Sequence, residues 1–157
     1  MACLRLPTPL GTLTLVGGDA GLRAVLFGAH AKTDDRHPLL VAAAEQLGEY
    51  FARERTAFDL PLDLAGTPFQ RRAWLALAAI PYGTTRSYGE QARVLGRPGA
   101  ARAVGAANGR NPLPIVLPCH RLVGSHGELT GYGGGLEVKR ALLELEGVPS
   151  HAARSSS

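Results

Sequence analysis

The chain has 157 residues, of which 45% are hydrophobic and 19% charged, and its formal net charge is +4. This is the composition of a soluble globular protein with one domain or two small ones. No stretch approaches the roughly 20 apolar residues that span a bilayer, and the first residues contain no long apolar run, so we expect no membrane anchor and no secretory signal.

The first 65 residues combine a short β meander with one helix. Leu4–Leu6, Leu13–Val16 and Leu22–Phe27 alternate apolar and polar residues between glycine-rich breaks, which predicts three strands. Apolar residues at helical spacing predict an amphipathic helix over Leu39–Phe51. The alternating stretch Phe58–Leu64 is consistent with either an edge strand or an extended linker.

Two capping boxes mark the first helices of the second half. Thr67–Gln70 has proline at the first helical position, and its helix is expected to continue to Ile80. Ser87–Glu90 is the second box, with a helix that should end near Leu95. The inward-facing residues of the first helix are expected to be Phe69, Ala73, Trp74 and Leu77.

A helix-turn-helix is predicted next. The turn Gly96–Gly99 separates the helix that ends near Leu95 from another over Ala100–Asn108, and two short helices joined in this way are typical of the motif. A glycine-rich loop over Gly131–Gly135 then precedes a last helix, Glu137–Glu146.

The helix over Ala100–Asn108 is almost bare of long side chains, with the exception of Arg102. Small residues permit close packing in a core, which is one interpretation. The other is a surface helix laid against nucleic acid, with reading by shape in the minor groove, because a major-groove reader needs several long polar side chains.

Charge is divided unevenly between the two halves. Residues 1–65 carry six basic and eight acidic side chains, a net charge of −2, whereas residues 66–157 carry eleven basic and five acidic ones, a net charge of +6. A basic half beside an acidic half indicates that the C-terminal part meets a polyanion, although many basic faces are merely solvated.

The stretch Pro114–Arg121 reads Pro-Ile-Val-Leu-Pro-Cys-His-Arg and contains a candidate nucleophile. Pro118 fixes φ and lacks an amide donor, which predicts an extended chain that presents Cys119 in one direction. The neighbouring imidazole and guanidinium favour the thiolate, the nucleophilic form. Adjacent side chains of an extended chain point to opposite faces, so a direct hydrogen bond from Cys119 to His120 is not expected. An inert buried thiol is the alternative.

Cys3 is the other cysteine of the sequence. Two thiols so far apart favour a reducing cytoplasmic location over a disulfide-bonded scaffold.

Six short motifs follow one another between about residues 66 and 147. They are Tyr88 after a capping serine, Ala101–Gly105, Asn111-Pro112, Pro118–Arg121, Tyr132–Gly135 and Glu146-Gly147. Together they resemble the O6-alkylguanine-DNA alkyltransferases, also called methylated-DNA–protein-cysteine methyltransferases. The Pro-Cys-His-Arg run is the specific part of the resemblance, which is vague before residue 66.

The resemblance implies an α+β fold in two domains. An N-terminal ribonuclease-H-like domain with a small sheet and a helix would cover residues 1–65, and a C-terminal helix-turn-helix, winged-helix-like domain holding the cysteine would cover residues 66–149. Residues 150–157 are small and polar, and we expect them to form a disordered tail.

The resemblance also implies an activity, direct-reversal DNA repair. The alkyl group would move from O6 of guanine, and from O4 of thymine, onto Cys119, irreversibly and once per molecule. A water would stand between Cys119 and His120, and Glu146 would orient the imidazole, which is a nucleophile, base and orienter arrangement. No cofactor is implied.

The same resemblance implies a pocket for the base. Tyr88 would hydrogen-bond guanine N3, the amide of Gly133 would face O6, and the carbonyls of Cys119 and Leu122 would accept from the exocyclic amine. The walls of the pocket would be Pro114 and Tyr132.

A base inside a stacked duplex is out of reach, so the nucleotide must be extruded. By resemblance, Arg102 would fill the vacated stack, Tyr88 would crowd the rotated phosphate and Asn111 would tie the helix-turn-helix to the cysteine segment. Double-stranded DNA would be bound through its minor groove by a monomer. The small residues against the DNA would be Ala101, Ala103 and Gly105.

Three further expectations concern departures from the family and its rivals. Animal members carry a structural zinc in the N-terminal part, but the plausible donors there are Cys3, His30 and His37, fewer than the four of a closed site, so we expect no metal. A non-catalytic alkyltransferase-like DNA binder would carry another residue in place of Cys119. A cysteine hydrolase, the second rival class, would turn over repeatedly.

Overall fold

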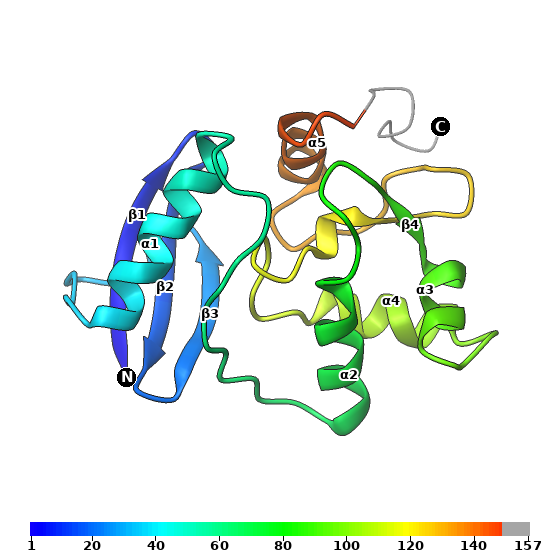
Figure 1. The fold of residues 1–157 in the computed structure, drawn as a ribbon, viewed down its shortest axis with the longest axis horizontal. Helices are drawn as coiled ribbons and strands as arrows, with labels where there is room; N and C mark the ends of the chain where they lie inside the picture. Colours follow the sequence, from blue (N-terminus) through cyan, green and yellow to red (C-terminus); the bar gives the residue numbers. More distant parts are fainter. Residues whose placement is uncertain (149–157) are drawn as a thin grey trace. The chain divides into compact units, whose positions relative to one another are not determined.

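The computed structural model describes residues 1–148, and the chain divides into two compact units, Met1–Ala65 and Gly66–Ser157 (Figure 1). The first unit is a small antiparallel sheet with one helix and the second is mainly helical, so the predicted α+β class is confirmed. The tail expected over 150–157 lies outside the described residues. Within residues 1–148, no helix is both long and apolar enough to cross a membrane.

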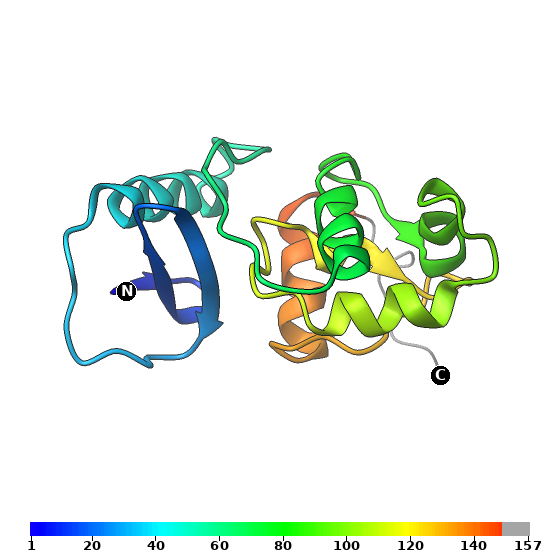
Figure 2. The same ribbon diagram turned by 90° about the horizontal axis from the view of Figure 1, so that it is seen from below.

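The first unit is the predicted meander with a helix on one face. Strands β1 (Ala2–Thr8), β2 (Gly11–Gly18) and β3 (Gly21–Phe27) pair antiparallel in that order. Helix α1 (Pro38–Phe51) lies across the sheet (Figure 2). The buried apolar side chains of these elements are Leu4, Leu13, Leu15, Leu22, Val25, Leu40, Ala43, Leu47 and Tyr50.

The segment Phe58–Leu64 is an extended linker with one β-bridge to the sheet, beside an ion pair between Asp63 and Arg23. Leu62 forms a single parallel bridge with Leu22, on the edge of β3. Gly21 permits this approach, because its φ is +137° and an added Cβ would stand 2.8 Å from the backbone of Leu62. One bridge does not make an edge strand, and the linker interpretation is therefore the correct one.

The second unit contains the remaining elements. They are α2 (Pro68–Leu77), β4 (Arg86–Ser87), α3 (Tyr88–Val94), α4 (Ala101–Gly109), the 3₁₀ helix η1 (Cys119–Arg121), β5 (Leu122–Val123) and α5 (Leu136–Leu145). Both predicted capping boxes form, with Thr67 and Ser87 accepting from the backbone amides three residues later.

Helix α2 ends at Leu77, three residues before the predicted end at Ile80. The amides of residues 78–80 bond to carbonyls three residues earlier, which tightens the last turn. Pro81 stops the helical turn after Ile80, because a proline disfavours the α conformation of the residue before it. Ala73, Trp74 and Leu77 of this helix are buried as predicted, but Phe69 is only half-buried.

Helices α3 and α4 pack together as the predicted helix-turn-helix. Trp74 joins α2 to α4 by donating a 2.7 Å hydrogen bond from Nε1 to the carbonyl of Ala107. Helix α4 has two faces: Val104, Ala107 and Asn108 are buried, whereas Arg102 and its neighbour Ala103 are exposed. The interpretation as a core helix therefore fits the buried face of α4, and the interpretation as a surface helix fits its exposed face.

Candidate active site

Cys119 opens the 3₁₀ helix η1, so the prediction of an extended chain at this point is wrong. Pro118 has the expected φ of −76°, but its ψ is 67°, and a proline ring restrains φ and leaves ψ free. The turn is closed by hydrogen bonds from Cys119 N to the Leu117 carbonyl (2.7 Å) and from Arg121 N to the Pro118 carbonyl (3.0 Å). Local backbone bonds, and not the proline, set the direction of the thiol.

His120 and Glu146 form a buried hydrogen-bonded pair. His120 Nε2 lies 2.7 Å from Glu146 Oε2, and neither side chain is exposed to solvent. Burial lowers the pKa of His120, against the opposing effect of the Glu146 carboxylate, and the imidazole is therefore neutral at pH 7. The carboxylate is an acceptor, which assigns the ring proton to Nε2 and leaves Nδ1 as an acceptor.

Nδ1 of His120 is buried and has no hydrogen-bond partner among the described residues. A buried polar atom without a partner is rare and is costly unless it has a role or binds water. His120 is therefore a candidate base, because no described protein group binds its proton-accepting atom, Nδ1.

Arg121 pairs with Glu146 and is not turned to the thiol. Its Nε and Nη2 donate to Glu146 Oε1 and Oε2 at 2.8 and 2.9 Å, and Nη1 donates to the Ile80 carbonyl at 2.7 Å. Glu146 caps the C-terminal end of α5, where the helix dipole disfavours an anion, and this bidentate pair offsets that effect.

The Cys119 thiol is 4% exposed, and burial raises its pKa. Hydrogen bonding from Asn111 and the charge of Lys139 act in the opposite direction but are smaller. The expectation that adjacent cations favour the thiolate is therefore incorrect for Arg121, and the cation that acts on the sulfur comes from α5. At neutral pH the group is a thiol that needs a base.

Two asparagines connect α4 to the cysteine segment. Asn111 Nδ2 donates to the Leu117 carbonyl and its Oδ1 accepts from the amide of Leu113, both at 2.9 Å. Asn108 Nδ2 donates to the Cys119 carbonyl at 3.4 Å. The helix-turn-helix and the thiol are thus held in one frame.

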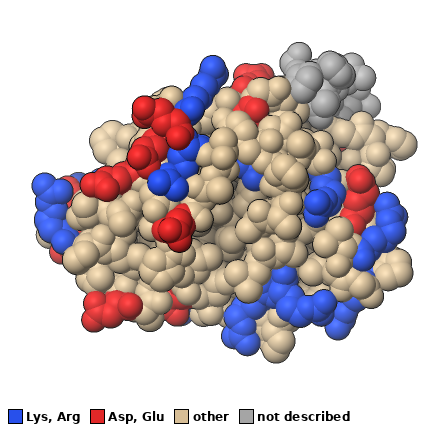
Figure 3. All heavy atoms as spheres, in the orientation of Figure 1, with Lys and Arg blue, Asp and Glu red and all other residues tan. Residues whose placement is uncertain are grey.

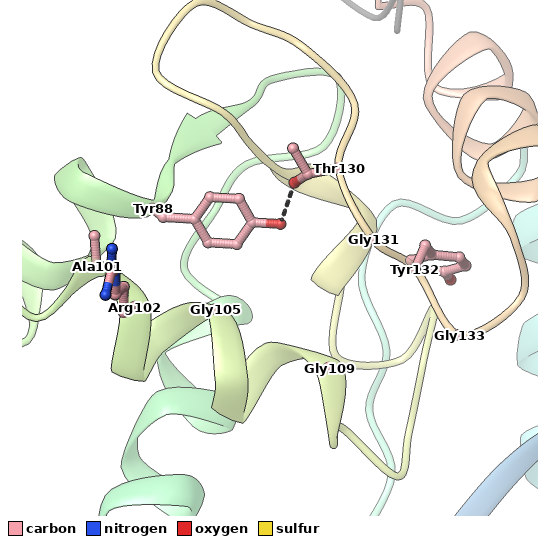
Figure 4. Close-up of a pocket in the computed structure, with 9 residues that line it drawn as sticks. All are labelled: Tyr88, Ala101, Arg102, Gly105, Gly109, Thr130, Gly131, Tyr132 and Gly133. Carbon is pink, nitrogen blue, oxygen red and sulfur yellow. Dashed lines mark hydrogen bonds between the residues drawn. The ribbon is translucent and has the colours of Figure 1, made fainter. Parts of the chain in front are cut away.

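A cavity of about 580 Å³ opens between α4 and the loop that precedes α5 (Figure 4). Its volume falls within the range of small-molecule sites, about 300–1,000 Å³. Two of its lining residues act electrostatically with Cys119: Tyr132 lowers the pKa of the thiol, and the charge of Cys119 raises the pKa of Tyr88. The cavity therefore adjoins the cysteine segment. The lining residues are Tyr88, Ala101, Arg102, Gly105, Gly109, Thr130, Gly131, Tyr132 and Gly133.

Tyr88 projects across this cavity from the first turn of α3 (Figure 4). Its hydroxyl lies 2.8 Å from Thr130 Oγ1. Burial raises the pKa of Tyr88, and the hydrogen bond to Thr130 opposes that rise. The ring packs beside Gly105 of α4, where an added Cβ would lie 3.8 Å from it, an ordinary van der Waals contact.

The residues proposed from the sequence for DNA binding and for the base pocket do not all line this cavity. Ala101, Arg102 and Gly105 line the cavity, but Ala103 lines a smaller one of about 250 Å³ on another face of α4. Pro114 and Leu122 are buried and are not among the cavity-lining residues.

Three residues of the site have no assigned role in the sequence analysis. Lys139 is fully buried and donates from Nζ to the Thr130 carbonyl at 2.9 Å, and burial lowers its pKa to about 8. A lysine on the apolar stripe of α5 was the signal that could have indicated it. The others, Asn108 and Thr130, act through partners distant in the sequence.

Exposed arginines gather on the second unit. Figure 3 shows basic side chains over α2 and the neighbouring part of the helix-turn-helix, and more acidic ones on the first unit. The exposed members are Arg71, Arg72, Arg93, Arg97, Arg102 and Arg110. Such a surface attracts a polyanion.

Within residues 1–148, no cluster of three or more His, Cys, Asp or Glu side chains is arranged to hold a metal ion. The candidate functional groups are Cys119, the buried His120–Glu146 pair and the neighbouring cavity. A helix-turn-helix beside a buried cysteine, a neutral histidine and a cavity with room for a nucleobase indicates a nucleic-acid-binding protein in which the cysteine is the candidate acceptor.

Comparison with known proteins places the chain in a family. Residues 68–148 match the family model of the 6-O-methylguanine DNA methyltransferase DNA binding domain, and residues 3–64 match that of its ribonuclease-like domain. The chain belongs to the 6-O-methylguanine DNA methyltransferase family, and the resemblance derived from the sequence is confirmed.

Individual relatives agree with this placement. The methylated-DNA–protein-cysteine methyltransferase of Mycolicibacterium paratuberculosis is 55% identical over 145 residues, 88% of each chain. That of Methanosarcina acetivorans is 46% identical, covering 89% of this chain and 94% of the relative. The crystal structure of Mycobacterium tuberculosis OGT in complex with DNA superposes with a TM-score of 0.85 at 48% identity, covering 98% of each chain.

Proposed function

We propose that this protein repairs O6-alkylguanine in double-stranded DNA by moving the alkyl group onto Cys119, once per molecule. The single observation that carries the proposal is the arrangement around the thiol: two residues that line a cavity with room for a nucleobase act on Cys119, and the buried His120–Glu146 pair leaves Nδ1 available to accept a proton. Membership of the family supplies the reaction class.

The reaction balances with these residues. The thiol proton of Cys119 passes through a water to His120 Nδ1, while Glu146 and Arg121 hold the imidazole with its proton on Nε2. The thiolate attacks the alkyl carbon in line, a carbon–sulfur bond forms and the bond from that carbon to O6 breaks. The guanine takes up one proton as it leaves, and His120 returns the thiol proton to water, so that no proton is gained or lost overall. Tyr88 donates a hydrogen bond to N3 of the base. Water does not readily cleave the thioether, so each molecule acts once.

The raised pKa of Cys119 explains why a base is needed. With the thiol protonated at pH 7, proton transfer must accompany attack, and a neutral imidazole of low pKa is present to accept the proton at that pH. Lys139 stabilises the anion as it forms, since its charge is close enough to act on the sulfur.

The remaining assignments concern DNA. Arg102 occupies the gap that the extruded nucleotide leaves, and Asn111 holds the cysteine segment against α4. The protein binds the minor groove as a monomer and accepts O4-alkylthymine as a second substrate. Gly133 at the cavity rim presents its amide to O6, and Tyr132 is a wall.

The proposed function is tested by stoichiometry. Protein mixed with an excess of duplex carrying O6-methylguanine is expected to consume one equivalent and then stop, and intact-mass analysis should show one added methyl group localised to Cys119. Continuing turnover would favour a cysteine hydrolase. DNA binding without any added mass would favour a non-catalytic lesion binder.

Replacing Arg102 with alanine is expected to slow repair of duplex DNA about 10- to 100-fold, because extrusion costs a few kcal/mol and the vacated stack stays empty. Methyl transfer from a free O6-alkylguanine base needs no extrusion and should change by less than about twofold. Rate constants for the two substrates give the comparison, with the exposed Arg36→Ala of the first unit as control. Equal losses on both substrates would refute the role of Arg102.

A further inference from the structure

Thr130, in the loop between β5 and α5, contacts two side chains of the site through two different atoms. Its hydroxyl oxygen lies 2.8 Å from the Tyr88 hydroxyl, across the cavity (Figure 4). Its carbonyl accepts a 2.9 Å hydrogen bond from Lys139 Nζ. Thr130 therefore links Tyr88, which lies in the cavity, to Lys139, whose charge acts on the sulfur of Cys119.

Hydrogen-bond counting assigns a direction to the contact with Tyr88. A phenol has one proton and can donate one hydrogen bond. If that proton is given to the base, the hydroxyl of Thr130 must donate to the phenol oxygen and not accept from it. A donor at the phenol oxygen also stabilises negative charge there, which agrees with the lowering effect of this bond on the pKa of Tyr88.

We propose that Thr130 is a positioning residue of the transfer reaction, whose hydroxyl donates to Tyr88 and thereby directs the tyrosine proton to N3 of the extruded base. The inference rests on the proposed function, and in particular on the role of Tyr88. Without the threonine hydroxyl, Asn108 still acts on the phenol, but the donor on the opposite side of the cavity is lost and the phenol proton is directed less firmly to the base. The departing guanine is then stabilised less in the transition state.

The two contacts of Thr130 can be separated by mutation, because the side-chain hydroxyl makes one and the backbone carbonyl makes the other. Thr130→Val removes the hydroxyl and keeps the branched shape and the carbonyl that binds Lys139. The cation beside Cys119 is therefore retained, and the variant isolates the contact with Tyr88. Thr130→Ser keeps a hydroxyl and is the conservative rescue variant. Thr130→Ala removes the hydroxyl without adding a branched apolar side chain, and it replaces Thr130→Val if the valine variant does not fold.

The experiment is a double-mutant cycle with Tyr88→Phe. The single-turnover rate constant of methyl transfer is measured at saturating O6-methylguanine duplex, together with the Kd for that duplex. Thr130→Val is expected to slow transfer about tenfold, the effect of one lost hydrogen bond, with Kd unchanged within about twofold. Thr130→Ser should transfer within about twofold of wild type. In the Tyr88→Phe background, adding Thr130→Val should change the rate by less than about twofold, because its partner is already absent.

The outcomes separate this inference from the proposed function. An unchanged rate in Thr130→Val, or the same tenfold loss in both backgrounds, would overturn the positioning role and leave alkyl transfer to Cys119 intact. A wild-type rate in Tyr88→Phe would remove the partner through which Thr130 acts and overturn it as well. Absence of any transfer by the wild-type protein would instead contradict the proposed function itself.

Discussion

Replacing Cys119 with serine is expected to abolish alkyl transfer while DNA binding persists. A saturated carbon attacked in line reacts with a soft, polarisable thiolate, and a hydroxyl has a far higher pKa than the thiol, so His120 cannot generate the nucleophile. The loss should exceed about 1,000-fold, comparable to removal of a nucleophile in other covalent enzymes. Intact mass after incubation with O6-methylguanine duplex should stay unchanged.

The chain offers a matched control for this variant in its second thiol. Cys3 lies on β1 of the first unit and is partly exposed, so Cys3→Ser should leave both the transfer rate and the added mass at wild-type values. DNA binding by both variants is measured on the same duplex. Transfer by Cys119→Ser, or loss of transfer in Cys3→Ser with Cys119 intact, would contradict the assignment of the acceptor.

Replacing Arg121 with methionine is expected to lower the free energy of unfolding by about 3–5 kcal/mol, the usual effect of removing one partner of a buried ion pair. Glu146 would keep its bond to His120 but lose both bonds from the guanidinium, at a helix end where a negative charge is disfavoured. Urea denaturation measures the change.

A second arginine in the same unit controls for the substitution itself. Arg72 is exposed and donates one hydrogen bond to the Leu95 carbonyl, so Arg72→Met should cost about 1 kcal/mol or less. Comparable stability losses in the two variants would mean that the buried pair makes no special contribution. Transfer by folded Arg121→Met should also slow, because Glu146 would orient His120 less firmly.

Local signals in the sequence predicted the elements that local physics controls. The two capping boxes form because Thr67 and Ser87 satisfy backbone amides three residues away, and no distant partner is needed. The meander of the first unit follows from period-two alternation between glycine breaks. The helix-turn-helix follows from two short helical patterns around Gly96–Gly99.

The cysteine segment shows where that reasoning failed. Pro118 suggested an extended chain, but the backbone bonds of Cys119 and Arg121 to nearby carbonyls close a 3₁₀ turn. The charge next to the thiol in sequence was also misleading, since Arg121 turns away to Glu146. Sequence proximity does not determine which way a long side chain points when a buried carboxylate competes for it.

The amino-acid sequence by itself indicated the candidate reactive atom, the family and the order of the elements, because the Pro-Cys-His-Arg run, the caps and the hydrophobic periods are local properties. Folding alone decided the environment of that atom. Burial raises the pKa of Cys119. Folding also places Lys139 of α5 close enough for its charge to act on the sulfur, and it places Thr130 in contact with Tyr88, 42 residues away in the chain. Desolvation and contacts between distant segments exist only once the core has closed, and no pattern within a single segment encodes them.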